Sequence, residues 1–150
     1  MTIRPDPTFY ATAKLAMEAP VETYAYTLML SPDFSQPDGL AVVGVDPSSS
    51  DYGKIVHTLF MPNKGDEFHH FGWNACSSCH DDAGKSRRFM VVPGFGSGRI
   101  HVLDTLYARA PTMHKIIEPE EIKSKTGLSA PHTVHCLADG HVMISMLGDA

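Results

Sequence analysis

The chain has 150 residues, 43% of them hydrophobic and 19% charged, and a formal net charge of −5 at pH 7. This length and composition are typical of one soluble domain with a sizeable hydrophobic core. The densest basic group has three members and forms no stripe, so we expect no nucleic-acid partner; it consists of Lys85, Arg87 and Arg88, which we interpret as the solvated start of a strand. No run of 18 apolar residues occurs, so we expect no membrane span.

Two features favour a cytoplasmic protein. Residues 1–7 contain no apolar stretch of the kind found in secretory signals. The cysteines, Cys76, Cys79 and Cys136, are too few and too odd in number for a disulfide framework, and they fit a reducing compartment with metal-binding or redox cysteines.

The chain begins with one helical segment and then becomes mostly β. Residues 8–18 predict a short helix that ends at Ala19-Pro20. Runs rich in β-branched and aromatic residues, separated by Pro, Gly, Asp and Ser, predict strands over residues 24–30, 40–45, 55–60, 89–92, 99–103 and 142–146. A second helix of one or two turns is predicted over residues 118–125.

A weak internal repeat suggests how these strands are assembled. In residues 42–57, a strand ends in Asp46 and a polar turn leads to a strand that opens with Lys54. Residues 100–117 repeat this pattern with Asp104 and Lys115. Repeated hairpins of this kind are typical of propeller blades, although any antiparallel meander produces a similar pattern.

The number of strands is too small for a closed ring. About two blades are present, whereas a propeller needs roughly four to eight. We therefore predict an all-β, antiparallel, incomplete β-propeller with a short N-terminal helix. Its open sheet edges are candidates for self-association.

The densest chemistry lies in residues 69–80, where three histidines, two cysteines and the single tryptophan fall within twelve positions. Cys76-x-x-Cys79 permits four interpretations: half of a zinc site completed by His132 and His135, a c-type haem attachment with His80, a thioredoxin-like redox pair, or a reactive dithiol on a loop that binds a soft element. The following Asp81-Asp82-Ala83-Gly84 favours a loop.

Two histidine groups are candidate metal ligands. His69 and His70 are adjacent, so both side chains can reach one ion only on a loop or a bulge. His132 and His135 face opposite ways on a regular strand but could converge on a turn. We interpret Cys136 as a small buried hydrophobic residue. The isolated histidines are interpreted as structural; they are His57, His101, His114 and His141.

Several blocks together resemble the selenium-binding protein/methanethiol oxidase family. The octet from Gly72 to Cys79 matches its signature. Further matching blocks occur in order over roughly residues 20–150: Met61-Pro62-Asn63 with Asp66-Glu67-x-His69-His70, Lys85-Ser86-Arg87, Ser97-x-Arg99-Ile100-x-Val102-x-Asp104, residues 114–119, residues 132–137 and residues 142–149. Family members are several times longer, and the chain matches their N-terminal part.

The resemblance implies a β-propeller-like domain and oxidation of methanethiol by dioxygen and water to formaldehyde, hydrogen sulfide and hydrogen peroxide. The partners are then a small thiol and dioxygen, and the cofactor is copper, which accepts imidazole ligands and changes oxidation state. Bacterial relatives hold copper by histidines, and for this chain we expect His69, His70, His132 and His135, with the His69-His70 pair the stronger candidate. The resemblance associates selenium with Cys76 or Cys79. A non-catalytic selenium- or thiol-binding module that uses Cys76 and Cys79 is the alternative, and no catalytic side chain is assigned.

Overall fold

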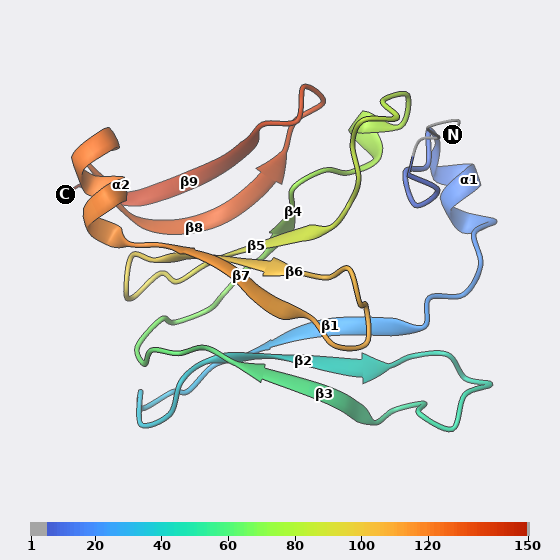
Figure 1. The fold of residues 1–150 in the computed structure, drawn as a ribbon, viewed down its shortest axis with the longest axis horizontal. Helices are drawn as coiled ribbons and strands as arrows, with labels where there is room; N and C mark the ends of the chain where they lie inside the picture. Colours follow the sequence, from blue (N-terminus) through green and yellow to red (C-terminus); the bar gives the residue numbers. More distant parts are fainter. Residues whose placement is uncertain (1–5, 150) are drawn as a thin grey trace.

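The computed structural model describes residues 6–149 as three antiparallel sheets that follow one another along the chain (Figure 1). The first contains β1 (Tyr24–Met29), β2 (Gly39–Gly44) and β3 (Ile55–Phe60). The second contains β4 (Gly72–Trp73), β5 (Phe89–Pro93), β6 (Ile100–Asp104) and β7 (Thr112–Ile117). The third pairs β8 (Leu128–Cys136) with β9 (Val142–Asp149). The predicted all-β, antiparallel class is confirmed.

All six predicted strands are present, and so is the strand that the internal repeat predicted around Lys115, which is β7. The strand expected over residues 142–146 continues to Asp149, and the other five agree within one or two residues. Two more strands, β4 and β8, are added. Residues 1–5, which entered the argument about a secretory signal, and Ala150 lie outside the described residues.

The internal repeat corresponds to two similar hairpins. The β2–β3 and β6–β7 pairs each contain one irregularity in register, between Val42 and Val43 in the first and between Val102 and Leu103 in the second. A bulge bends a strand and increases its twist, so each of the two hairpins is distorted once along its first strand. The repeat therefore reflects a blade-like unit that occurs twice.

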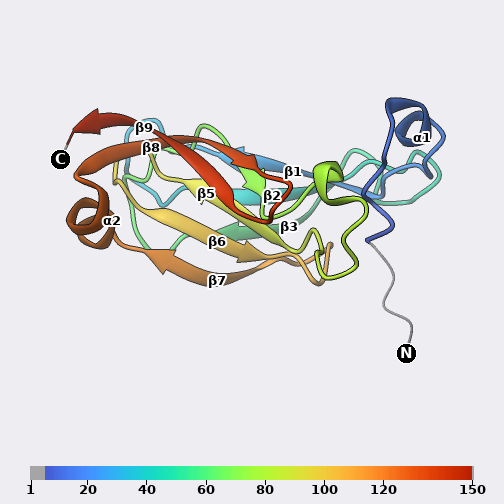
Figure 2. The ribbon, with the colours of Figure 1, turned by 90° about the horizontal axis from the view of Figure 1, so that it is seen from above.

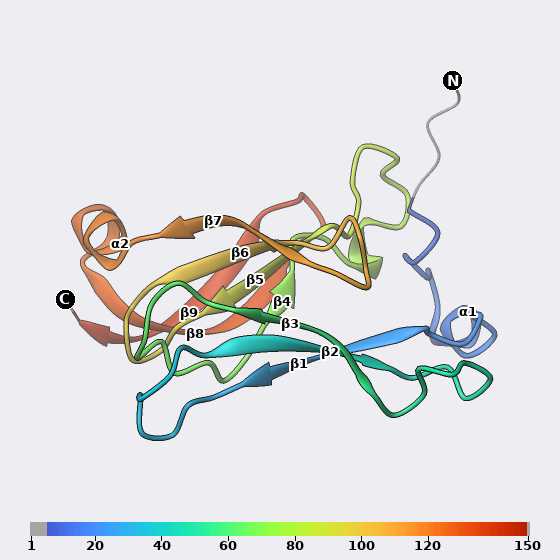
Figure 3. The same ribbon diagram turned by 60° about the horizontal axis from the view of Figure 1, so that its bottom comes forward.

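Two helices lie at opposite ends of the molecule (Figure 3). α1 (Ala13–Met17) is shorter than predicted because Thr12 begins it, accepting a hydrogen bond from the Leu15 amide at 3.3 Å. α2 (Pro119–Thr126) agrees with the prediction within one residue. It has proline in its first turn and ends at Gly127, whose φ of 69° is left-handed. α2 carries the chain from β7 to β8, the first strand of the third sheet (Figure 2).

The main core lies between the first two sheets. Leu40 from β2 packs with Met90 and Val92 from β5 and with Leu103 from β6, and the connecting loop adds Met61 and Phe68. All six side chains are at most 3% exposed. Burying one such side chain contributes roughly 1.5–3 kcal/mol, so this cluster is the main force that holds the first two sheets together.

The third sheet has only two strands, and its outer side is open. Exposure alternates along β9, and β9 has no second partner strand within residues 6–149. An apolar groove of about 390 Å³ runs between this sheet, the end of β7 and α2; its apolar lining includes Ile117, Ile122, Leu128, Val142, Ile144 and Met146. The expected open edge is present, and self-association through it stays a prediction.

The basic group at the start of β5 is not simply solvated, so our interpretation of it was incomplete. The Arg88 guanidinium donates from Nε to Asp104 Oδ1 at 2.8 Å and from Nη2 to Oδ2 at 2.5 Å. Arg87 lies over the Trp73 ring, with its Cζ 5.3 Å from the ring centroid. These basic side chains fasten β5 to β6 and β4 because each finds an anionic or aromatic partner.

The Arg88–Asp104 pair should make stability depend on pH in acid. Hydrogen bonds from Arg88 and from the Leu106 amide lower the pKa of Asp104 from 3.8 to about 2. The stabilisation is therefore fully present above the ordinary pKa and is lost as pH falls from about 4 to about 2. We expect urea midpoints of Asp104→Asn to lie below wild type at pH 6 and to converge with it near pH 2. A constant difference across that range would contradict the assignment.

Candidate metal centre

The loop of residues 61–71, which carries His69 and His70, is held from both sides by backbone and side-chain contacts. Phe68 faces inward into the main core, and its amide donates to Asp38 Oδ2 at 2.9 Å. Glu67 has a left-handed φ of 58°, and the loop forms an isolated bridge between Phe68 and Gly94 instead of a continuous strand pairing. The chain is thus irregular at the histidines, which is the condition we predicted for both of them to share a site.

The structure brings a third histidine to this pair. His132 lies on β8, at a register shift between Pro131 and Val134. Its ring centroid is 4.4 Å from that of His70 and 5.5 Å from that of His69. Three imidazoles from two distant segments therefore form one group, which we call the histidine cluster (His69, His70 and His132).

His135 does not belong to the histidine cluster. Burial alternates along β8, with His132 and Val134 half-buried and Thr133 and His135 exposed. Successive side chains of a strand point to opposite faces, so His135 lies on the outer face. Within the described part of the chain, no ring contact or hydrogen bond joins it to the cluster. The structure thus brings three of the four predicted ligands together and leaves the fourth apart.

His69 and His132 each contact a neighbouring side chain through one ring nitrogen, and the other nitrogen of each ring faces the other histidine. His69 Nε2 lies 3.2 Å from Glu67 Oε1, and His132 Nδ1 lies 3.1 Å from Thr133 Oγ1. The Glu67 carboxylate can only accept, so His69 Nε2 carries a proton, whereas the Thr133 hydroxyl can donate to His132 Nδ1 or accept from it. The remaining nitrogens, His69 Nδ1 and His132 Nε2, lie 3.4 Å apart, either as an N–H···N hydrogen bond or as two deprotonated nitrogens.

This arrangement fits two ligands of one transition-metal ion. Two nitrogens bound at about 2.0 Å and at a tetrahedral angle lie about 3.3 Å apart. Within residues 6–149, no three His, Cys, Asp or Glu side chains already converge on one ion. His70 is the third imidazole of the cluster, with its ring centroid 4.4 Å from that of His132.

The electrostatics favour neutral imidazole at His132. Desolvation and the neighbouring His70 and His69 lower the pKa of His132 below 6.5. A neutral ring keeps the lone pair that a metal requires.

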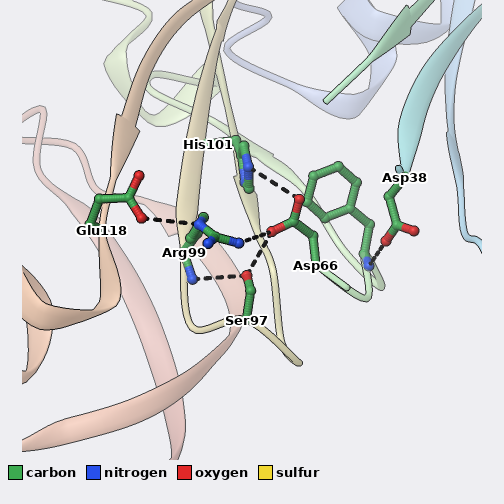
Figure 4. A network of polar contacts seen from close by, with 7 residues as sticks. Asp38, Asp66, Ser97, Arg99, His101 and Glu118 are labelled. Atoms are coloured by element: carbon green, nitrogen blue, oxygen red, sulfur yellow. Dashed lines mark hydrogen bonds and ion pairs between the residues drawn. The ribbon is translucent and has the colours of Figure 1, made fainter. Parts of the chain in front are cut away.

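A network of polar contacts around the buried Asp66 holds the loop of residues 61–71 in place (Figure 4). Asp66, which is fully buried, accepts from Ser97 Oγ at 2.7 Å and from Arg99 Nη1 at 3.3 Å. Arg99 also pairs with Glu118 at 3.0 Å, and His101 Nε2 lies 3.5 Å from Asp66 Oδ2. Burial lowers the pKa of His101, which Asp66 opposes. His101 is fully buried within this network, and its structural role stays a prediction.

Phe95 and the two carboxylates of Asp38 and Asp66 were missed as functional residues. The Phe95 ring stacks on His69, with centroids 5.5 Å apart and planes at 24°, and meets His132 edge-on at 5.7 Å. The only signal in the sequence was an aromatic residue isolated within Gly94-Phe95-Gly96-Ser97-Gly98. A large side chain in a glycine-rich turn needs a reason, because such turns are otherwise chosen for small residues.

The cysteines are arranged differently from the prediction. Cys76 forms a disulfide with Cys136, and Cys79 is the free thiol. Cys79 is 2% exposed, packs with Phe9 and Ala75, and points its sulfur at the Leu137 and Ala138 carbonyls, each at 3.6 Å. The reactive-dithiol, zinc, haem and thioredoxin-like interpretations all need Cys76 free or joined to Cys79, so each of them would require reduction of this disulfide. The argument for a reducing compartment from cysteine number loses its basis.

The disulfide joins the two segments that carry the histidine cluster. Cys76 follows β4, three residues after Trp73, while Cys136 ends the strand that holds His132. β4 and β8 also approach closely, because a Cβ on Gly72 would lie 2.7 Å from Val134 Cγ1. Glycine at this position and the disulfide together keep His70 beside His132.

Within residues 6–149, no helix is long and apolar enough to cross a membrane.

The fold and the site define a class: consecutive antiparallel blades, with histidines gathered where two blades meet. The chain belongs to the 56 kDa selenium binding protein (SBP56) family, whose model matches residues 3–150. Its strand content and open sheets agree with an incomplete propeller-like fold.

Similar proteins cover nearly the whole chain but are much longer. Selenium-binding protein 2 of Arabidopsis thaliana is 50% identical over 143 residues, which are 93% of this chain and 29% of that protein. Methanethiol oxidase of Rattus norvegicus is 48% identical over 93% of this chain and 30% of its own length. The X-ray structure of a hypothetical selenium-binding protein from Sulfolobus tokodaii superposes with a TM-score of 0.89 at 49% identity and covers 96% of this chain and 33% of that one. The chain thus spans about a third of the length of these relatives.

The disulfide should contribute measurably to stability. It closes a sequence separation of 60 residues, for which a loop-entropy estimate gives about 4 kcal/mol. We expect the Cys76→Ser/Cys136→Ser double variant to lose about this much free energy of unfolding in urea, and a reductant to shift wild type but not the double variant. Cys79→Ser is the control, since it should respond to reductant as wild type does. Equal midpoints for oxidised and reduced wild type would refute the role of the bond.

Proposed function

We propose that the protein is a copper-dependent thiol oxidase that converts methanethiol, dioxygen and water to formaldehyde, hydrogen sulfide and hydrogen peroxide. The observation that supports this most is the approach of His69 Nδ1 to His132 Nε2 at 3.4 Å, with the His70 ring beside them. Two imidazole nitrogens at this distance can both bind one transition-metal ion when neither carries a proton. The names of several relatives, methanethiol oxidase, supply the substrate.

His69 Nδ1 and His132 Nε2 would hold the ion, and the hydrogen bonds to Glu67 and Thr133 would keep these nitrogens deprotonated. Copper would supply redox cycling and favour the thiolate form of a bound thiol. His70 lies beside this position and is the nearest imidazole to accept the thiol proton if it does not bind the ion. The overall conversion balances with one molecule of each reactant and of each product: dioxygen is reduced to hydrogen peroxide, and the methyl carbon is oxidised to formaldehyde.

The proposal concerns the complete reaction, and this chain covers 30% of the length of the rat methanethiol oxidase. An ion held by two or three imidazoles of this chain still has open positions. Those positions suit a thiol, dioxygen or a further protein ligand.

A second candidate is a selenium- or thiol-binding module without turnover, for which the sequence suggested Cys76 and Cys79. The names of the plant relatives support selenium binding. In this arrangement Cys79 is the free thiol and Cys76 becomes available only after reduction. Selenium binding should then require reductant, which separates this candidate from the histidine site.

Histidine variants test the copper site directly. We expect His69→Ala and His132→Ala to weaken copper binding by at least about tenfold, and Glu67→Gln to have a smaller effect through His69. His135→Ala is the matched control, because it removes the same side chain from the same strand on the outer face. Copper content would be measured by mass spectrometry and methanethiol consumption by gas chromatography, on this chain and on a full-length relative.

Two results would overturn the proposal. One is copper content in His69→Ala and His132→Ala equal to that of wild type and of His135→Ala. The other is stoichiometric selenium uptake with no methanethiol turnover at any copper loading, which favours the binding module. Circular dichroism of each variant shows whether the sheets are retained.

A further inference from the structure

Phe95 is the one aromatic side chain in the turn between β5 and β6, and the turn is fixed against the loop that carries His69 and His70. The Phe95 amide donates to the Glu67 carbonyl at 3.2 Å, and the Gly96 amide donates to the Asp66 carbonyl at 3.0 Å. A Cβ on Gly96 would lie 3.1 Å from both Glu67 Cβ and the Gly65 carbonyl oxygen, so the turn and the loop approach each other closely here. The Ser97 hydroxyl adds a third bond, to the Asp66 side chain.

The Phe95 ring rests on the two imidazoles, His69 and His132, whose nitrogens lie 3.4 Å apart. It stacks on His69 and meets His132 edge-on, with centroids 5.5 Å and 5.7 Å away. The ring brings neither charge nor a ligand atom, and it is half-buried. It therefore forms an apolar wall beside the position proposed for the ion.

We propose that Phe95 determines substrate specificity, admitting a small alkanethiol to the ion and disfavouring longer or charged thiols. This rests on the proposed function and extends it to the substrate class. A thiol bound at an open position of the ion would lie next to the ring, where sulfur and a methyl group both make favourable contacts with an aromatic face. A charged thiol such as glutathione would lose hydration against the same surface.

The test compares Phe95→Ala and Phe95→Leu with wild type in the full-length, copper-loaded protein. We expect the preference for methanethiol over butanethiol, as the ratio of kcat/KM values, to fall about tenfold in Phe95→Ala and to change little in Phe95→Leu. The kcat/KM for glutathione should rise relative to that for methanethiol only in Phe95→Ala. Phe60→Ala is the matched control, because Phe60 is an exposed phenylalanine on β3, in the first sheet.

Two measurements without turnover accompany these rates. Anaerobic titration with each thiol, followed by the thiolate-to-copper absorption band, gives dissociation constants that should show the same change of preference. Proton NMR of the His69 ring in metal-free protein should lose its ring-current shift in both Phe95 variants and keep it in Phe60→Ala.

Each outcome decides a different question. Retained copper and methanethiol turnover with an unchanged thiol preference in Phe95→Ala overturns the role of Phe95 and leaves the oxidase proposal intact. Loss of copper from both Phe95 variants makes Phe95 a positioning residue for His69, which also overturns the specificity role. Absence of copper from wild type overturns both proposals.

Discussion

Two buried carboxylates hold the loop on which the histidine site depends. Asp38, at the start of β2, accepts amide hydrogens from Ser31 and Phe68, each at 2.9 Å, and so links the first sheet to the residue just before His69. Asp66 binds Ser97 and Arg99 of the second sheet. Both side chains are fully buried, and a buried carboxylate without donors is strongly unfavourable, so each bond also fixes the loop in one position. The irregular backbone at His69 and His70 is stable because its neighbours on both sides are anchored.

The same anchors explain why the site lies between sheets. Phe68 belongs to the core shared by β2, β5 and β6, so packing and hydrogen bonding act on one residue. The glycine-rich turn after β5 docks on Asp66 and thereby carries Phe95 to His69. A loop held only by water would leave three imidazoles free to separate. Here the supporting residues restrict them to an arrangement that suits a metal.

Local patterns predicted most of the fold, because strand alternation and turn residues act over a few positions. The hairpins, both helices and the loop at His69-His70 were readable in this way. The part of the site that could be predicted was the segment where histidines and cysteines lie close together in the sequence. Contacts between distant segments could not be predicted. His132 lies 63 residues from His69, and the alternation of side chains along a strand did not show whether His132 or His135 would face it. Cys79 is the nearer partner for Cys76 in sequence, yet packing against Phe9 and Ala75 buries it, while β8 delivers Cys136. Asp38 and Asp66 looked like ordinary loop carboxylates because burial is not visible in a polar segment.

The histidine cluster forms only when the third sheet, which carries His132, packs against the second sheet. A two-stranded sheet is marginally stable alone, so β8 depends on its contacts with β4 and β5 and on the disulfide. β8 also carries His132, whereas His69 is fixed to the first two sheets. An ion bound across His69 and His132 would bind only the docked arrangement and would therefore stabilise it by mass action. Metal affinity and docking of the third sheet are then two measures of one equilibrium, and whatever loosens β8 from β4 weakens the site even though no ligand is changed.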